Sequence, residues 1–270
     1  MAKASPSDNL DILRQIANNP GDRISVQNLR KSGRMTARER INALLDTDSF
    51  VEIDAFIQHR SGDHNLHLHR PLGDGVVAGH GMLDGRRIVC FAQDYSIFEG
   101  TMGEMHAKKI SKIVEFAEKS MLPVIGIWDG DGQRAHEGVS SLGATGQLLD
   151  IFAACSGRIP IISLVLGTVS GVSALAAGLS DFVILGSEHG QMFMRSPYFI
   201  PEIVNGEIDE ETLGGAESHS SRSGIACLVA DDEHDAINIA AEILGYLPDH
   251  TLAEPLNVKS GDKWNRSCKK

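Results

Sequence analysis

Apolar residues recur along this chain with two different periods, and the two periods alternate from about residue 73 onward. Short, nearly continuous apolar runs at 123–128, 159–166 and 182–186 are typical of buried parallel strands. Between and after them, apolar or small residues at helical spacing predict helices over 104–119, 139–155, 172–179 and 234–247. This alternation predicts an α/β fold in which right-handed crossovers cover a largely parallel sheet.

The segments before this alternating region follow other patterns. A loose apolar stripe containing Leu10, Leu13 and Ile16 predicts a peripheral helical arm over residues 1–31. Thr36 followed three residues later by Glu39 is typical of a capping box. The segment 76–92 predicts two strands joined by a tight turn at Asp84-Gly85. We expect one main domain over residues 32–250 and a flexible tail over 251–270.

Composition narrows the classes of protein that fit. The formal net charge of -11 argues against a general nucleic-acid surface, which needs clustered Lys and Arg. The four cysteines are far apart, which argues against a zinc ribbon and fits a reducing compartment. The N-terminus lacks an apolar signal region, and the run 159–166 is too short to cross a bilayer. We therefore expect a soluble cytoplasmic protein that contacts neither nucleic acid nor membrane.

A polar segment at 58–71 contains His59, His64, His67 and His69. A metal site is one interpretation of these histidines. We favour a solvated loop, because no carboxylate or cysteine lies at ligand spacing. The sequence therefore predicts no metal site.

Two glycine-bearing segments carry the candidate chemistry, since each follows one of the apolar strands. Residues 129–134 follow the first strand, and residues 167–173 follow the second. A strand that ends in a glycine-rich turn before a helix leaves backbone N–H groups pointing outward. Two such turns on adjacent strands are able to hold an oxyanion that develops on a substrate carbonyl. The candidate catalytic positions are Gly132, Gln133, Gly171, Val172 and Ser173.

Other catalytic interpretations have weaker support. Asp129, Asp131 and Glu137 suggest acid/base chemistry, but loop carboxylates are more often simply solvated. Ser170 and Ser173 lack the frame of a nucleophilic serine. The run 130–132 lacks the third glycine and the downstream acid of a dinucleotide-binding fingerprint.

Residues spread over 32–250 form segments that are similar to those of one known family. The similar segments lie in both the helical and the glycine-rich parts of the chain. They include Thr36-Ala37-Arg38-Glu39-Arg40-Ile41, Gly73-Asp74-Gly75, Gln93-Asp94, Gly100, Gly103, Asp129, Gly132, Arg134, Glu137-Gly138, Gly167, Gly171, Asp181-Phe182, Leu213-Gly214-Gly215-Ala216 and Tyr246-Leu247-Pro248.

These segments resemble the carboxyltransferase β subunits of biotin-dependent acyl-CoA carboxylases. The resemblance implies a crotonase-like ββα-superhelix (ClpP/crotonase type) in which an oxyanion hole stabilises an enolate. It implies that this chain corresponds to the family's N-terminal half, which binds the acyl-CoA thioester. Acyl-CoA contacts are then expected at Gly100, Arg134, Gly167 and Gly171. The implied cofactor is biotin carried on a partner. The implied partners are a biotin-binding carboxyltransferase half and a biotin carboxyl carrier protein, in an oligomeric assembly.

The chain departs from the family pattern inside both candidate loops. The family's Ser-Gly-Gly-Ala-Arg is here Gly130-Asp131-Gly132-Gln133-Arg134, and its Gly-Gly-Ala is here Gly171-Val172-Ser173. Its usual tyrosine is replaced by Leu175. Two alternatives therefore stay open. One is a malonyl-thioester decarboxylase subunit of the malonate decarboxylase β type, and the other is a non-catalytic subunit that binds acyl-CoA or assembles a partner.

Overall fold

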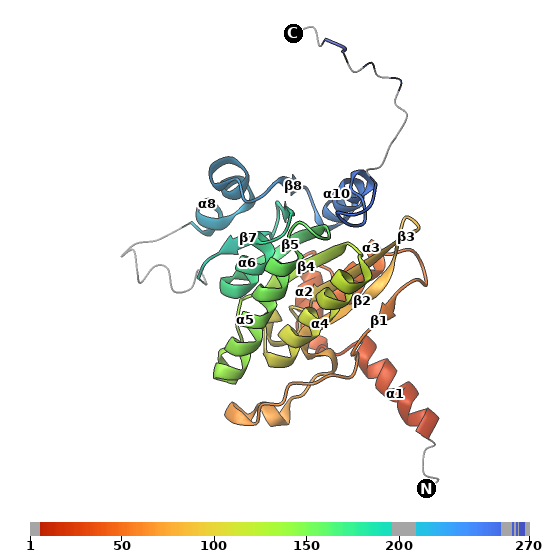
Figure 1. Ribbon diagram of the computed structural model, residues 1–270. Helices are drawn as coiled ribbons and strands as arrows, with labels where there is room; N and C mark the ends of the chain where they lie inside the picture. Colours follow the sequence, from red (N-terminus) through yellow and green to blue (C-terminus); the bar gives the residue numbers. More distant parts are fainter. Residues whose placement is uncertain (1–5, 196–208, 255–260, 262, 264, 268–270) are drawn as a thin grey trace.

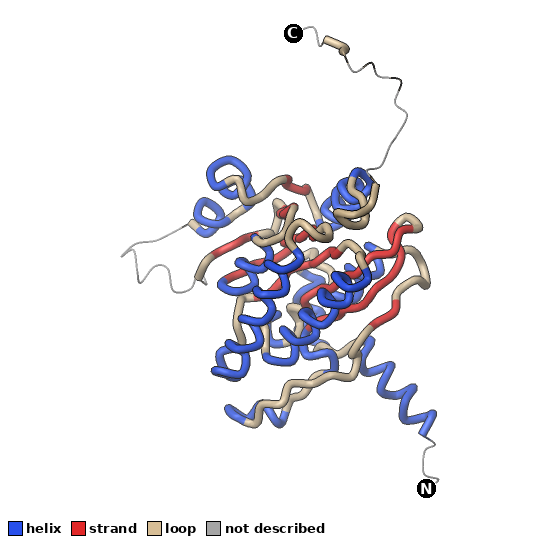
Figure 2. The backbone as a smooth tube through the Cα atoms, in the orientation of Figure 1, coloured by secondary structure: helices blue, strands red, loops and turns tan. Residues whose placement is uncertain are grey.

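The computed structural model describes residues 6–195, 209–254, 261, 263 and 265–267, and it contains an eight-stranded mixed sheet with helices on both faces (Figures 1 and 2). The strand order is β1-β2-β3-β4-β5-β6-β8, and β7 pairs with β5. The strands are β1 (Val51–Glu52), β2 (Val76–Leu83), β3 (Arg86–Gln93), β4 (Val124–Gly130), β5 (Ile161–Ser170), β6 (Phe182–Gly186), β7 (Gln191–Phe193) and β8 (Leu228–Ala230). The longer helices are α1 (Pro6–Asn18), α2 (Arg23–Lys31), α3 (Ala37–Leu44), α4 (Glu104–Ser120), α5 (Gly138–Cys155), α6 (Gly171–Gly178) and α10 (Glu233–Tyr246).

The sheet changes direction at β3. Strands β1, β2 and β3 are antiparallel, and β2 and β3 join through Asp84 and Gly85, which both have positive φ. From β3 onward every pairing along β3-β4-β5-β6-β8 is parallel. The predicted hairpin and the predicted largely parallel sheet are both confirmed.

Alternating side chains along the strands build a separate core on each face of the sheet. Phe91 and Trp128 pack in the core that includes residues of α4, α5 and α6. Ile88, Cys90 and Ile127 pack in the core that includes residues of α3 and α10. Both faces are covered, which explains why the strands are apolar almost throughout.

Several boundaries differ from the sequence prediction. The strand expected to end at residue 166 continues to Ser170, because Thr168, Val169 and Ser170 pair with β7. The residues of β7 and β8 were not predicted as strands. The capping box is confirmed, since the Thr36 hydroxyl accepts from the Glu39 amide and the Glu39 carboxylate accepts from the Thr36 amide.

The histidine-rich segment is less solvated than predicted. His59 is only 1% exposed, and its Nε2 lies 2.8 Å from the carbonyl oxygen of His69. The short 3-10 segment η1 (Asp63–Leu68) buries Leu66 against the protein. The description of this segment as a solvated loop is therefore wrong for His59 and Leu66.

Three further expectations concerned a metal site, a membrane-spanning segment and the C-terminal tail. Within the described residues, no group of three or more His, Cys, Asp or Glu side chains is placed to hold a metal ion. No helix in the described part of the chain has the length and apolar character needed to cross a bilayer. Residues 255–260, 262, 264 and 268–270 of the expected tail lie outside the described residues.

Candidate active site

The candidate site lies where β4 and β5 end side by side. The two strands are parallel neighbours, with Trp128 opposite Val165 and Gly130 opposite Val169. A shift in register between Trp128 and Gly130 bends the end of β4. β5 leads directly into α6, whose first residue is Gly171. The expectation that the two glycine-bearing segments leave adjacent strands is confirmed.

The first turn of α6 contains the candidate residues Gly171, Val172 and Ser173. Gly171 has a φ of +54°, and no side chain caps the helix. Among the described residues, no group accepts a hydrogen bond from the amide of Val172 or Ser173. The Ser173 hydroxyl is also fully buried without a partner there. Unpaired amides at the positive end of a helix favour an anionic oxygen.

The first loop supplies fewer donors than the sequence suggests. The Gly132 amide donates to the carbonyl oxygen of Gly130 at 2.9 Å, so this amide is not available to a ligand. The Gly132 amide is thus paired within its own turn, and its candidate catalytic role stays a prediction. Next along the chain, the Gln133 amide has no acceptor among the described residues, while its side-chain Nε2 donates to the Gly138 carbonyl at 3.3 Å.

A hydrogen bond joins the two loops. The Ser170 hydroxyl donates to Oδ1 of Asp131 at 2.6 Å. A Cβ at Gly132 would lie 3.0 Å from the Ser170 carbonyl oxygen, so the two segments are in close contact at this point. This bond fixes the separation between the Gln133 amide and the start of α6. Sequence reasoning missed it, although both residues stood in the loops under consideration.

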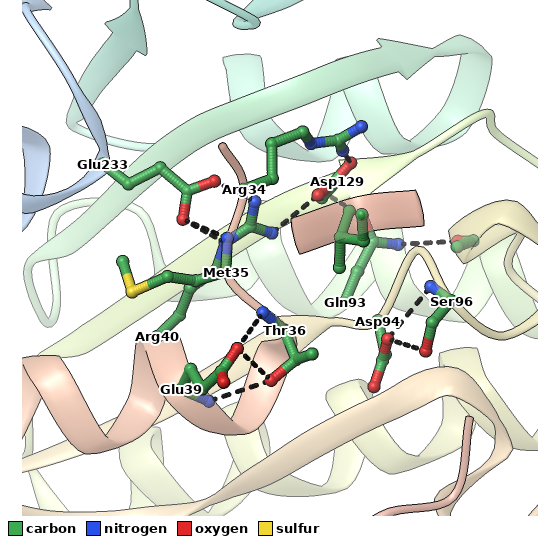
Figure 3. A network of polar contacts seen from close by, with 12 residues as sticks. Arg34, Met35, Thr36, Glu39, Arg40, Gln93, Asp94, Ser96, Asp129 and Glu233 are labelled. Atoms are coloured by element: carbon green, nitrogen blue, oxygen red, sulfur yellow. Dashed lines mark hydrogen bonds and ion pairs between the residues drawn. The ribbon is translucent and has the colours of Figure 1, made fainter. Parts of the chain in front are cut away.

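The end of β4 is held by a buried ionic network (Figure 3). The Asp129 carboxylate is fully buried and pairs with Arg34 and, at 2.7 Å, with Arg40. Arg40 also holds Glu233 at the start of α10, and the Asp129 amide donates to Gln93 Oε1 at 3.0 Å. A carboxylate paired with two guanidinium groups holds the end of the strand in position. Sequence reasoning did not predict this network.

Two glycines that the resemblance assigned to acyl-CoA contacts pack against this strand end. A Cβ at Gly167 would collide with the Asp129 carboxylate, and a Cβ at Gly100 would collide with the Asp129 carbonyl oxygen. These positions are glycine because neighbouring backbone and buried groups leave no space for a side chain. The structure gives Gly100 and Gly167 a packing role, and the substrate contacts expected there stay predictions.

Arg134 is likewise a structural residue. Its side chain is 2% exposed, and its Nη1 lies 2.7 Å from Asp74 Oδ1 and 2.8 Å from Glu137 Oε1. Its Nη2 donates to the Thr101 carbonyl at 2.9 Å. The guanidinium is buried and paired inside the protein, so its position does not support the acyl-CoA contact expected from the resemblance, which stays a prediction. Glu137 is buried in the same pair, which also removes it as a solvated acid or base.

A buried histidine continues the polar contacts beneath the site. Burial, with the nearby Arg134 charge, lowers the pKa of His106 to about 3, so its imidazole stays neutral. Its Nδ1 lies 3.0 Å from the Asp74 carbonyl and therefore carries the proton. The His106 Nε2 then accepts a hydrogen bond from the side-chain Nε2 of Gln93 at 3.3 Å. This bond orients the Gln93 side chain, whose Oε1 accepts from the backbone amide of Asp129.

The fold and the paired strand ends define a class, an α/β protein of the crotonase-like superfamily related to carboxyltransferases. The chain belongs to the carboxyl transferase domain family, which matches residues 28–270.

Individual relatives agree with this family. The biotin-dependent acetyl-/propionyl-coenzyme A carboxylase beta5 subunit of Mycobacterium tuberculosis is 46% identical over 224 residues, which cover 83% of this chain and 41% of that protein. The methylmalonyl-CoA decarboxylase subunit alpha of Veillonella parvula is 38% identical over 237 residues, 88% of this chain and 47% of that protein. The chain thus spans less than half the length of these relatives.

Among solved structures, transcarboxylase 12S with hydrolysed methylmalonyl-coenzyme A bound matches with a TM-score of 0.92 and 31% identity. The match covers 97% of this chain and 51% of that chain. A similarity of this extent covers both the sheet and the helices that present the candidate site.

Proposed function

We propose that this chain is the acyl-CoA-binding part of a biotin-dependent carboxyltransferase. Its partners are then a biotin-binding carboxyltransferase half and a biotin carboxyl carrier protein. The family and the names of the relatives support this reaction class. The free thiols of Cys90, Cys155 and Cys227 are consistent with a cytoplasmic location.

The α6 amides are the groups that stabilise charge in this proposal. The carbonyl oxygen of the thioester accepts hydrogen bonds from Val172 and Ser173, and the Gln133 amide approaches from the other loop. As the α-carbon loses its proton, negative charge moves onto this oxygen, where the amides and the helix dipole stabilise it. The enolate carbon then forms the new bond to CO2. Carboxybiotin held by a partner would supply the CO2 as its N–CO2 bond breaks, and the ureido nitrogen freed by that cleavage would accept the α-proton.

One observation carries the proposal: the first-turn amides of α6 have no acceptor within the described residues. A helix end without partners beside a glycine-rich loop is what binding of an oxyanion requires. The carboxylates nearby already have partners: Asp129 pairs with two arginines, Glu137 pairs with Arg134, and Asp131 accepts a hydrogen bond from the Ser170 hydroxyl. Backbone donors are therefore the groups available for this chemistry.

The test replaces Gly171 by alanine in the protein purified with its partner subunits. The φ of +54° disfavours any residue with a Cβ, so the backbone shifts and the amides that follow rotate away from the site. Loss of one oxyanion donor lowers kcat about 10²–10³-fold. We expect a loss of this order in carboxyl transfer.

Gly157→Ala is the matched control. Gly157 has a φ of +71° and open space around its Cβ position, so the substitution introduces similar strain away from the site. We expect this variant to keep its activity. Equal activity in folded Gly171→Ala and Gly157→Ala proteins would refute the oxyanion role.

Decarboxylation is a second candidate, because a relative 38% identical to this chain is named methylmalonyl-CoA decarboxylase subunit alpha. The same amides would stabilise the enolate that remains after CO2 leaves. Release of CO2 from malonyl-CoA or methylmalonyl-CoA by the chain without a biotin-bearing partner would favour decarboxylation. Carboxyl transfer that requires such a partner would favour the first proposal. Binding of acyl-CoA without either reaction would indicate a non-catalytic subunit.

A further inference from the structure

An apolar pocket of about 310 Å³ lies beside α6, and nothing in the mechanism above uses it. Its walls come from α5, α6, β7 and the segment around residues 219–225. The lining residues are Leu149, Ala174, Leu175, Gly178, Leu179, Met192, Phe193, Met194, His219 and Ile225. We propose that this pocket holds an aliphatic acyl chain of the substrate, and this inference rests on the function proposed above.

The pocket runs along α6 from Ala174, the residue that follows the proposed donors in the chain. Ala174, which lines it, follows Ser173 directly in the first turn of α6. Met194, another lining residue, has its carbonyl oxygen 4.0 Å from the position of a Cβ on Gly171. From there the pocket follows α6 to Leu179. The proposal therefore places the thioester oxygen at the α6 amides and the acyl group along the same helix, in this pocket.

The chemistry of the walls selects an uncharged, apolar occupant. No charged side chain lines the pocket within the described residues. The one polar ring, His219, is committed to the protein: its Nε2 donates to the Met192 carbonyl at 2.9 Å, and its Nδ1 accepts from the Ser223 hydroxyl at 2.8 Å. A ligand in the pocket thus meets aliphatic, thioether and aromatic carbon, which favours hydrocarbon over a polar group.

The size of the pocket sets the class of substrate. Its volume is about ten times the 30 Å³ that a water molecule occupies in the liquid, which leaves room for several methylene groups. Each methylene buried in an apolar site increases affinity about four-fold. The substrate class is therefore a CoA thioester of an aliphatic acid with several carbons beyond the acetyl group.

Gly178 allows a direct test. It lines the pocket at the end of α6, its φ is not positive, and a Cβ there meets nothing within 4 Å. Gly178→Leu therefore fills the pocket without disturbing the fold. Gly245→Leu is the matched control, because Gly245 also lies in a helix with open space, but in α10 and outside the pocket.

The assay measures binding and turnover of acetyl-, butyryl-, hexanoyl- and octanoyl-CoA by the full chain purified with its partner subunits. We expect affinity in the wild-type and Gly245→Leu proteins to rise about four-fold per methylene until the pocket is full. We expect Gly178→Leu to bind acetyl-CoA normally and to lose the gain from longer chains.

Each other outcome identifies which proposal fails. Binding of all four thioesters with equal affinity would overturn the acyl pocket and leave the proposed function intact. Failure to bind any of them would overturn the proposed function itself. A change of assembly in Gly178→Leu with an unchanged chain-length series would assign this surface to a protein partner, and would also overturn the pocket.

Discussion

Replacing Arg134 by methionine separates a structural role from a substrate-binding role. The guanidinium neutralises two buried carboxylates, Asp74 at 2.7 Å and Glu137 at 2.8 Å, and fills a site that is 2% exposed. Removing one partner of a buried ion pair costs about 3–5 kcal/mol, because the charges left behind are unpaired. At about 2–4 °C per kcal/mol for a chain of this size, the expected fall in Tm is about 6–20 °C.

The pH dependence of this loss has a definite sign. Burial raises the pKa of Asp74, and the Arg134 charge opposes that rise, so the variant raises this pKa further. A carboxyl whose pKa is higher in the folded state destabilises the fold while it is ionised. Stability therefore recovers as pH falls toward the folded pKa. We expect the difference in Tm between wild type and Arg134→Met to be larger at pH 8 than at pH 5.

Thermal unfolding of both proteins at the two pH values is the assay, with Arg158→Met as the control. Arg158 pairs with Glu118 at 2.6 Å but is 54% exposed, so its loss changes stability by about 0–1 kcal/mol. An Arg134→Met protein with wild-type Tm and a raised KM for acyl-CoA would refute this reasoning. That result would return Arg134 to the substrate-binding role inferred from the sequence.

Three shorter predictions follow. Ser170→Ala removes the hydrogen bond to Asp131 and is expected to lower kcat more than it changes KM. Ser170→Thr keeps the hydroxyl and is expected to keep its activity. The same kcat and KM in the two variants would exclude a positioning role for Ser170. Burial lowers the pKa of His106 to about 3, so its ring resonances in NMR spectra are expected not to shift between pH 5 and 8. A titration of these resonances near pH 6.5 would contradict its burial. Iodoacetamide is expected to label the exposed Cys227 before Cys90, because Cys90 is buried and burial raises the pKa of its thiol. Peptide mapping that finds Cys90 labelled first would contradict this packing.

Features set by neighbours in the sequence were predictable. The capping box depends on residues three apart, and the β2–β3 turn depends on the dipeptide Asp84-Gly85. β6 was predicted at 182–186, where the structure has it, because its apolar run is short and clearly bounded. The candidate start of α6 was located for the same reason, since the glycine and the small residues of this helix lie in one segment.

Features that depend on distant partners were not predictable. β5 extends to Ser170 only because β7 pairs with its end, and no local pattern signals that pairing. The resemblance assigned Arg134 to acyl-CoA binding, and no local pattern shows that the fold brings Asp74, 60 positions away, within hydrogen-bond distance of it. The Gly132 amide seemed available because a single sequence does not show that the turn closes on Gly130.

The central claim is that the α6 amides polarise the carbonyl of a bound thioester, and its infrared stretching frequency tests this most directly. The measurement uses acyl-CoA labelled with ¹³C at the thioester carbonyl, bound to the protein purified with its partners. We predict that the frequency falls on binding and returns toward the free value in Gly171→Ala, whose backbone no longer presents the amides. The same frequency for bound and free thioester in the wild-type protein would contradict the account.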